Sequence, residues 1–210
     1  MECGLAQKSR HDSATLFCIP TAWTVKTVNM ALQATRADAV TVEMLDIVDA
    51  HNRVIGCAPR REVHRLSLRH RAVHMLIQDI EGRIYLQRRA PHKDVDPDLW
   101  DTSAAGHVDL GEDYLDAARR ELHEELALTD IDLQVLCDLP ARTATGEEFV
   151  RVYTGRTATE PRPDAREIAA GGWWTLHDLG LWLAREPEIF TATFKQIYGE
   201  FLARGMDSAS

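Results

Sequence analysis

Cysteine is scarce in this sequence, and the positions of its cysteines suggest neither a set of disulfides nor a metal site. The four cysteines are Cys3, Cys18, Cys57 and Cys137, and none is spaced from another cysteine or a histidine as zinc ligands are. Disulfide scaffolds are typical of short secreted chains, whereas this chain has 210 residues, 45 % of them hydrophobic. We therefore expect reduced thiols in a reducing compartment.

Long hydrophobic runs are also missing. No apolar stretch approaches the roughly 20 residues that a membrane-spanning helix requires. Residues 1–26 lack the basic start, apolar stretch and small-residue cleavage site of a secretion signal. These absences predict a cytoplasmic protein that does not insert into a membrane.

The sequence has no excess of positive charge, and its net charge is −9 at pH 7. Binding to a nucleic-acid polymer needs a basic face, so we expect no such partner. The charge is uneven, because residues 51–93 are rich in Arg and His whereas most carboxylates lie in the second half. This distribution suits a small anionic ligand bound through cations, although many such charges would otherwise form solvated surface.

Residues 1–41 show no sustained hydrophobic period, and we interpret them as an N-terminal extension rather than a folded unit. Met30 leaves open whether residues 1–29 belong to the native protein. One domain is expected over residues 42–204, followed by a tail at 205–210. Strands are expected at 44–48, 53–56, 72–79, 83–88, 131–139 and 149–154, with a strand end at 173–174. Helices are expected at 113–126, 176–184 and 191–203, and residues 106–111 read as a loop. This alternation predicts a mixed α/β fold.

Three glutamates of the helix expected at 113–126 share one face. Glu121, Glu124 and Glu125 are spaced by three and four residues, and apolar side chains on the opposite face would hold them together near the protein surface. Clustered carboxylates suit Mg²⁺ or Mn²⁺, ions that bridge phosphate oxygens and lower the pKa of a bound water. The alternative is a solvated acidic face that neighbouring arginines balance.

The same segment resembles the Nudix signature, G-x5-E-x7-R-E-U-x-E-E-x-G-U, in which U is a bulky aliphatic residue. The matching residues are Gly106, Glu112, Arg120, Glu121, Leu122, Glu124, Glu125 and Leu128. Ala127 stands where the family has glycine, at a helix end that favours the left-handed conformation. Alanine there suggests a slightly different helix exit without loss of chemistry. The resemblance implies a Nudix-type α/β/α sandwich with a mixed sheet.

The resemblance also implies roles for these residues. The implied ligands of Mg²⁺ or Mn²⁺ are Glu121, Glu124, Glu125 and the carbonyl group of Gly106. Glu112 and Arg120 would form a structural pair that fixes the loop against the helix. The implied reaction is hydrolysis of a diphosphate linkage, in a nucleoside diphosphate derivative or a similar small diphosphate, by metal-activated water. Glu124 and Glu125 are thus candidate catalytic residues.

Residues outside the signature are candidates for the base and for phosphate binding. Glu167 lies where the family often supplies a base, and Glu147 and Glu148 compete for that role. The candidates for contacts with the substrate are Arg88, Arg89, Lys93 and His107. Guanidinium groups match phosphate oxygens, but Arg88 and Arg89 are adjacent in an expected strand, so at most one of them faces the site.

Other segments resemble bacterial hydrolases that are often grouped with isopentenyl diphosphate isomerase. The isomerases carry a catalytic cysteine immediately before Gly-His, and this sequence has Ala105 there. Proton transfer to a double bond needs an acid and a base, so we favour the hydrolase. An isomerase-like enzyme and a non-catalytic nucleotide-binding module remain the alternatives.

Partial matches to the metal site of the isomerases leave a second site open. The residues concerned are His64, His70, His107 and Glu148. The alternative is that these histidines are ordinary strand or surface residues. The sequence identifies neither the physiological substrate nor the oligomeric state.

Overall fold

The computed structural model describes residues 42–205, and the predictions made for residues 1–41 and 206–210 lie outside that range. The strands are β1 (Met44–Val48), β2 (Val54–Pro59), β3 (His70–Gln78), β4 (Ile84–Arg89), β5 (Trp100–Asp101), β6 (Ala104–His107), β7 (Gln134–Leu139), β8 (Glu148–Arg156) and β9 (Ile168–Trp174). The helices are α1 (Arg60–Arg65), α2 (Tyr114–Leu126), α3 (Leu176–Arg185) and α4 (Ala192–Ala203), with 3₁₀ turns at Thr143–Thr145 and Pro187–Ile189. None of the helices in the described range is long and apolar enough to cross a membrane.

The larger sheet consists of two halves that diverge. Its order is β5-β4-β3-β8-β7, with β6 paired to β3 and β9 paired to β4. β3 and β8 run parallel over their whole length, but β3 and β4 share only the pair Gln78–Ile84. Away from that pair, β6 pairs with β3, whereas β5 and β9 pair with β4. The space between the two halves is where the candidate site lies.

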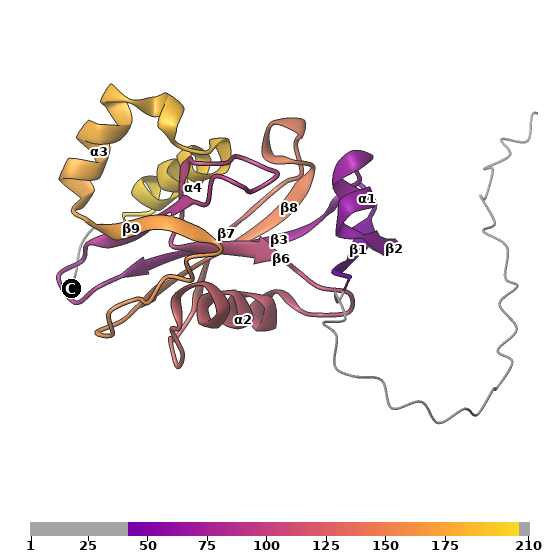
Figure 1. The fold of residues 1–210 in the computed structure, drawn as a ribbon, viewed down its shortest axis with the longest axis horizontal. Coiled ribbons are helices and arrows are strands. Elements are labelled where there is room, and N and C mark those ends of the chain that lie inside the picture. Colours follow the sequence, from indigo (N-terminus) through magenta and orange to yellow (C-terminus); the bar gives the residue numbers. More distant parts are fainter. Residues whose placement is uncertain (1–41, 206–210) are drawn as a thin grey trace, which may run out of the picture. The chain divides into compact units, whose positions relative to one another are not determined.

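Helices cover both faces of this sheet, as Figure 1 shows. Along β3, Ala72 and Leu76 belong to the core that includes α3 and α4, whereas Val73 and Met75 belong to the core that includes α2. Side chains alternate between the two faces of a strand, so successive apolar residues of β3 serve the two cores in turn. The expected α/β/α sandwich with a mixed sheet is confirmed.

A separate hairpin joins the sandwich through a small core of its own. β1 and β2 pair antiparallel, and Leu45, Ala58 and Val63 of α1 are buried together. Backbone hydrogen bonds connect β1 to the segment after β6, from Leu110 N to the carbonyl oxygen of Met44 at 2.9 Å. The hairpin and α1 thereby stand beside the loop that precedes α2.

Several expected boundaries need correction. α1 and the short strands β5 and β6 were not predicted, and Gly106 and His107 belong to β6 rather than to a loop. β7 begins at Gln134 and not at residue 131. The strands among these elements are short and contain few β-branched residues, so their conformation depends on pairing with neighbouring strands more than on local preference.

The end of α2 also differs from the expectation. Ala127 takes the left-handed conformation itself, with φ 53° and ψ 30°. Its N–H donates to the carbonyl oxygen of His123 at 3.0 Å. The helix therefore ends as it would with glycine, and the prediction of a different exit was wrong.

Candidate active site

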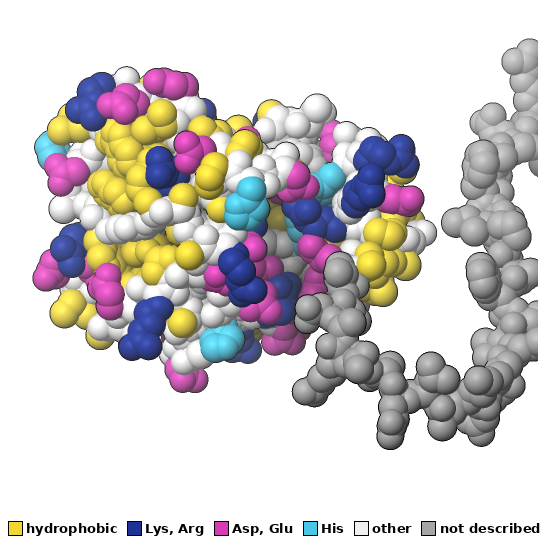
Figure 2. Space-filling view, viewed as in Figure 1, with side chains coloured by type: hydrophobic (Ala, Val, Ile, Leu, Met, Phe, Trp, Pro, Cys, Tyr) yellow, Lys and Arg dark blue, Asp and Glu magenta, His cyan; other side chains and the backbone are white. Residues whose placement is uncertain are grey.

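A cavity of about 900 Å³ opens where the two halves of the sheet diverge. Its walls come from α1, α2, β6, the segment between β4 and β5, and the segment before β9. Nearly all of its lining side chains are charged or polar. Figure 2 shows charged and histidine side chains gathered between α2 and α1 on the face drawn there.

The acidic face of α2 forms one wall, and most of it is buried. Glu125 is 4 % exposed, and it accepts hydrogen bonds from Gln87 Nε2 at 2.9 Å and from the N–H of Ala105 at 3.2 Å. The side chain of Glu121 is 13 % exposed, and only Glu124, at 57 %, reaches solvent freely. The expectation that these carboxylates lie near the surface was wrong for two of them, because residues of β4 and β6 pack against them.

Burial changes the protonation of the two covered carboxylates. It raises the pKa of Glu121 to about 7. Burial, together with repulsion from Glu121, raises the pKa of Glu125 to about 8. Two such groups one helical turn apart ionise together when a positive charge lies between them. Carboxylates of this kind fit Mg²⁺ or Mn²⁺, which prefer oxygen ligands.

Gly106 is required by the close approach of β6 to α2. A Cβ atom built on Gly106 would overlap the carboxylate of Glu121. Only glycine leaves room for that carboxylate beside the strand. The glycine of the signature thus sets the position of an acidic side chain.

Arg120 connects the loop before α2 to the acidic face. Its Nε and Nη2 donate to the two carboxylate oxygens of Glu112 at 3.0 and 2.9 Å. Nη2 also donates to the carbonyl oxygen of His107 at 2.9 Å, and Nη1 donates to Glu121 Oε1 at 2.7 Å. Such bidentate pairing fixes both geometry and charge. Arg120 therefore holds the loop and orients Glu121.

A histidine cluster lies farther along the cavity, toward α1. His64, His70 and His107 each place a ring nitrogen so that the three atoms lie within 4.8 Å of one another. Glu148 approaches two of them, at 3.4 Å from His70 Nε2 and 3.6 Å from His107 Nε2. Imidazole and carboxylate groups in this arrangement could hold a second cation.

The pKa values in this cluster diverge. Burial and the neighbouring His107 lower the pKa of His64 to about 4. Burial alone would lower the pKa of His107, but hydrogen bonds to Glu148 and Glu43 raise it to about 9. The two histidines hold the pKa of Glu148 far below its usual range although burial opposes this. His107 is therefore protonated beside the carboxylate of Glu148 at neutral pH.

Comparison with known proteins places this site in a family. The model of the NUDIX domain matches residues 68–194, which is more than half of the chain. The chain belongs to the Nudix family. The match includes α2, β6 and most of the segments that line the cavity, whereas α1 and Glu43 lie before it.

The chain is also similar to individual proteins. The chain is 34 % identical over 170 residues to a protein of Serratia proteamaculans named isopentenyl-diphosphate Delta-isomerase, covering 79 % of this chain and 94 % of that relative. It is 42 % identical over 93 residues to an uncharacterized Nudix hydrolase of Yersinia pestis, covering 44 % of this chain and 51 % of the relative. The crystal structure of DR0079 from Deinococcus radiodurans is similar with a TM-score of 0.66 and 28 % identity, covering 74 % of this chain and 97 % of that one.

The two arginines expected in one Nudix strand are separated by a break in register. β4 shifts register against β9 between Arg88 and Arg89. Arg89 lines the cavity and donates to the carbonyl oxygen of Val95 at 3.2 and 3.1 Å. Among the described residues, the side chain of Arg88 is not part of the lining, and it lies 3.6 Å from Asp98. Arg89 is thus the candidate of the pair that faces the site.

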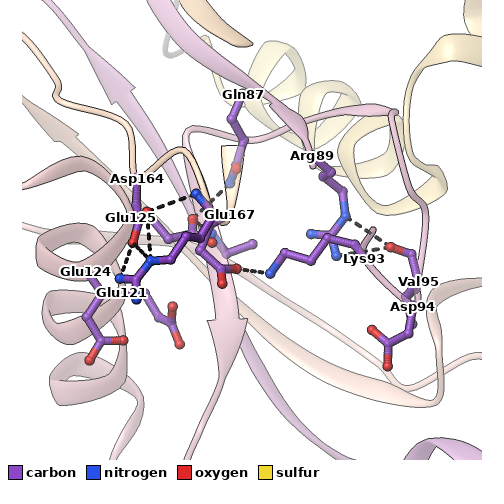
Figure 3. Close-up of polar contacts among 12 residues, drawn as sticks. Gln87, Arg89, Lys93, Asp94, Val95, Glu121, Glu124, Glu125, Asp164 and Glu167 are labelled. Atoms are coloured by element: carbon purple, nitrogen blue, oxygen red, sulfur yellow. Dashed lines mark hydrogen bonds and ion pairs between the residues drawn. The ribbon is translucent and has the colours of Figure 1, made fainter. Parts of the chain in front are cut away.

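Lys93 and Glu167 meet across the cavity. Lys93 Nζ donates to Glu167 Oε2, and both residues line the space in front of Glu125 (Figure 3). The segment before β9 is fixed to α2 by a bond from Asp164 N to the carbonyl oxygen of Glu125 at 2.9 Å. Of the two competing acids, Glu148 lines the cavity within the described range, whereas Glu147 pairs with Arg69 outside it.

Sequence reasoning missed two features of this Nudix site. Gln87 is fully buried in β4 and contacts Glu125, but nothing in a strand sequence distinguishes such a glutamine from a surface one. Arg60 forms a bidentate pair with Asp94 at 2.9 and 2.8 Å, which joins α1 to the segment after β4. Their opposite charges were visible, but only the fold brings them together.

Proposed function

We propose that this chain is a Nudix hydrolase that cleaves a diphosphate linkage of a small molecule with Mg²⁺ or Mn²⁺. The observation that carries the proposal is the pair of buried carboxylates, Glu121 and Glu125, whose pKa values are raised in a cavity that also presents cationic side chains. An acidic pair buried in this way is a functional arrangement more often than a stabilising one.

The cations would be held by the acidic wall. Glu121, Glu124 and Glu125 are the proposed ligands, with the carbonyl group of Gly106 as a further one. When bound, Mg²⁺ or Mn²⁺ neutralises charge on the diphosphate and activates water. Arg120 keeps Glu121 in place for this task.

The opposite wall would bind the substrate and accept the proton. Arg89 and Lys93 line the cavity and are suited to phosphate oxygens. Glu167 is the proposed base. Because Lys93 engages its carboxylate, a diphosphate that draws Lys93 away would free Glu167 to accept a proton from water.

An isomerase activity is the second candidate, and the histidine cluster favours it. His64, His70, His107 and Glu148 resemble the metal site of isopentenyl diphosphate isomerases, and a relative with that name is 34 % identical. Ala105 speaks against it, because a methyl group at this place in the cavity has no proton to donate and no nucleophilic atom. Hydrolysis needs neither at that position.

The test is product release from a panel of diphosphates with Mg²⁺, Mn²⁺ or a chelator. The panel contains nucleoside di- and triphosphates, nucleotide sugars, dinucleotides, coenzyme A and isopentenyl diphosphate. We expect metal-dependent hydrolysis that Glu124→Gln and Glu125→Gln each reduce about a hundredfold or more, because charge stabilisation of several kcal/mol is lost. Glu188→Gln, at an exposed acid outside the cavity, is the matched control and should keep full activity.

Other outcomes distinguish the rival functions. Near-normal activity in both variants would refute the role of α2 in holding the cation. Formation of dimethylallyl diphosphate from isopentenyl diphosphate, without hydrolysis of any compound, would establish the isomerase. Tight binding of a nucleotide without turnover would instead indicate a binding module.

A further inference from the structure

We propose that the cavity contains a second, polar subsite on the face of the sheet opposite α2, in which His74 accepts a hydrogen bond from a hydroxyl group of the substrate. This inference rests on the proposed function, because it concerns the part of the substrate that the diphosphate carries. We infer that the group attached to the diphosphate is hydroxylated, such as a sugar ring, rather than a hydrocarbon chain.

The cavity extends through the divergence of the sheet to the α4 face. His74 follows Ala72 and precedes Leu76 at alternate positions of β3, so it shares their face, which packs toward α4. His74 lines the cavity together with Asp101 of β5 and Thr193 of α4. The diphosphate would lie near α2 while the remainder of the substrate reaches this second wall.

The hydrogen bonds around His74 determine which ring nitrogen is free. The hydroxyl group of Thr102 donates to the carbonyl oxygen of Ala104 at 3.2 Å, so its oxygen accepts from His74 Nδ1 at 2.8 Å. Nδ1 is therefore the ring nitrogen that carries a proton toward Thr102. Nε2 has no partner among residues 42–205, and its lone pair is available to a donor in the cavity.

Rigid surroundings hold this acceptor in place. Asp101 is 4 % exposed, and its Oδ1 accepts from the N–H of Thr102 at 2.8 Å and from Thr191 Oγ1 at 3.1 Å. Thr193 is 7 % exposed, and within the described range its hydroxyl group has no hydrogen-bond partner. Neither this hydroxyl group nor His74 Nε2 is among the buried polar atoms without a partner in the described range, so both atoms are open to the cavity. A hydroxylated ligand would hydrogen-bond to both by displacing water from them.

The lining excludes the alternative of a hydrocarbon chain. Its apolar side chains are only those of Ala72, Val95 and Ala105, and no leucine, isoleucine, methionine, phenylalanine, tyrosine or tryptophan of residues 42–205 lines the cavity. A prenyl group would gain little by burial there and would displace water from polar atoms without replacing its hydrogen bonds. The volume of about 900 Å³ accommodates a much larger polar molecule.

The test uses His74→Asn, because the asparagine side-chain NH₂ can still donate to Thr102 while the acceptor at Nε2 is removed. Thr193→Val is a second, nearly isosteric variant. The matched control is Thr154→Val, at a threonine of β8 that is 5 % exposed and lies outside the cavity lining. Substrates are ADP-ribose and UDP-glucose, and isopentenyl diphosphate and inorganic pyrophosphate serve as competitors that lack a hydroxyl group.

We expect His74→Asn and Thr193→Val each to raise KM for the better sugar-containing substrate about tenfold, the effect of one lost hydrogen bond. The inhibition constants of the two competitors should not change, and Thr154→Val should behave as wild type. Equal losses for all ligands, no loss for any, or a preference of the wild type for isopentenyl diphosphate would overturn the subsite.

Calorimetry separates this inference from the proposed function. If the wild type hydrolyses nothing, the hydrolase proposal fails, and binding of ADP-ribose then tests the subsite alone. Binding that His74→Asn weakens about tenfold would support the subsite in a protein without turnover. Binding that the variant leaves unchanged, or no binding at all, would refute it.

Discussion

Glu121 owes its position to a residue without a side chain. Gly106 leaves room for the carboxylate, and Arg120 donates to it, so the acid is held between β6 and the loop before α2. The signature pattern alone predicted that all three residues belong to the site. Their burial could not be predicted, because it depends on β6, whose sequence Ala-Ala-Gly-His has little strand preference.

Gly106→Ala should therefore disturb the acidic wall. We expect a loss of about 1 kcal/mol or less in the free energy of unfolding, because the added methyl group meets only the carboxylate end of the flexible Glu121 side chain, which must move away. Turnover should fall with it. Urea unfolding and activity measurements check this, with Gly56→Ala in β2 as the control.

The control glycine is exposed, and no atom lies within 4 Å of a Cβ built there. Gly56→Ala should change stability by less than about 0.5 kcal/mol. If Gly106→Ala were as stable and active as Gly56→Ala, the close packing of β6 against Glu121 would have no role in the site.

α2 is the element that the sequence predicted best. The spacing of its apolar residues determines which face is buried. Its N-cap, Asp113, accepts hydrogen bonds from the N–H groups of Leu115 and Asp116 and so determines where the helix begins. The short elements α1, β5 and β6 escaped prediction because tertiary contacts define them, whereas the short strands β1 and β4 were expected at 44–48 and 83–88. Apolar runs between turn residues made those two visible.

Ala127→Gly should stabilise the protein, because the left-handed conformation costs alanine about 1–2 kcal/mol and costs glycine nothing. Glycine also increases the conformational entropy of the unfolded chain, which offsets part of this stabilisation. We therefore expect a net increase of about 0.5–1 kcal/mol in the free energy of unfolding. Urea unfolding measures it.

Ala203→Gly provides a control of opposite sign. Ala203 is the exposed last residue of α4 and has no positive φ, so glycine there should destabilise by about 0.5–1 kcal/mol. A destabilising Ala127→Gly would mean that the left-handed residue is not strained.

At the scale of the whole molecule, the sandwich concentrates titrating groups in one cavity. Helices on both faces and a sheet that splits in two create a cavity whose lining side chains are nearly all charged or polar. The class of fold followed from the order of the elements and from the signature. The depth and polarity of the cavity did not, because they depend on the divergence of β3 from β4 after a single residue pair.

The stability of the metal-free protein should decrease as pH rises from 6.5 to 8.5. The folded pKa values of Glu121 and Glu125, about 7 and 8, lie above the usual 4.5, so the folded state binds more protons in this window. His107, raised to about 9, acts in the same direction. His64 opposes the trend only below pH 6.5, because its pKa is lowered to about 4.

Urea unfolding in chelator measures this decrease. Mg²⁺ should restore stability at pH 8.5, since a ligand of the folded state stabilises it. Glu125→Gln should flatten the dependence. A free energy of unfolding that is constant or rises over this window would show that the buried acids keep ordinary pKa values in the folded protein.

The parallel pairing of β3 with β8 has a consequence for biosynthesis. The register from His70–Glu148 to Gln78–Arg156 closes a loop that contains β4, β5, β6, α2 and β7. Closing so long a loop is entropically costly and slow. The histidines and Glu148 can meet only after β8 has been synthesised and has docked. A growing chain on the ribosome therefore carries the complete acidic helix well before it possesses a cavity.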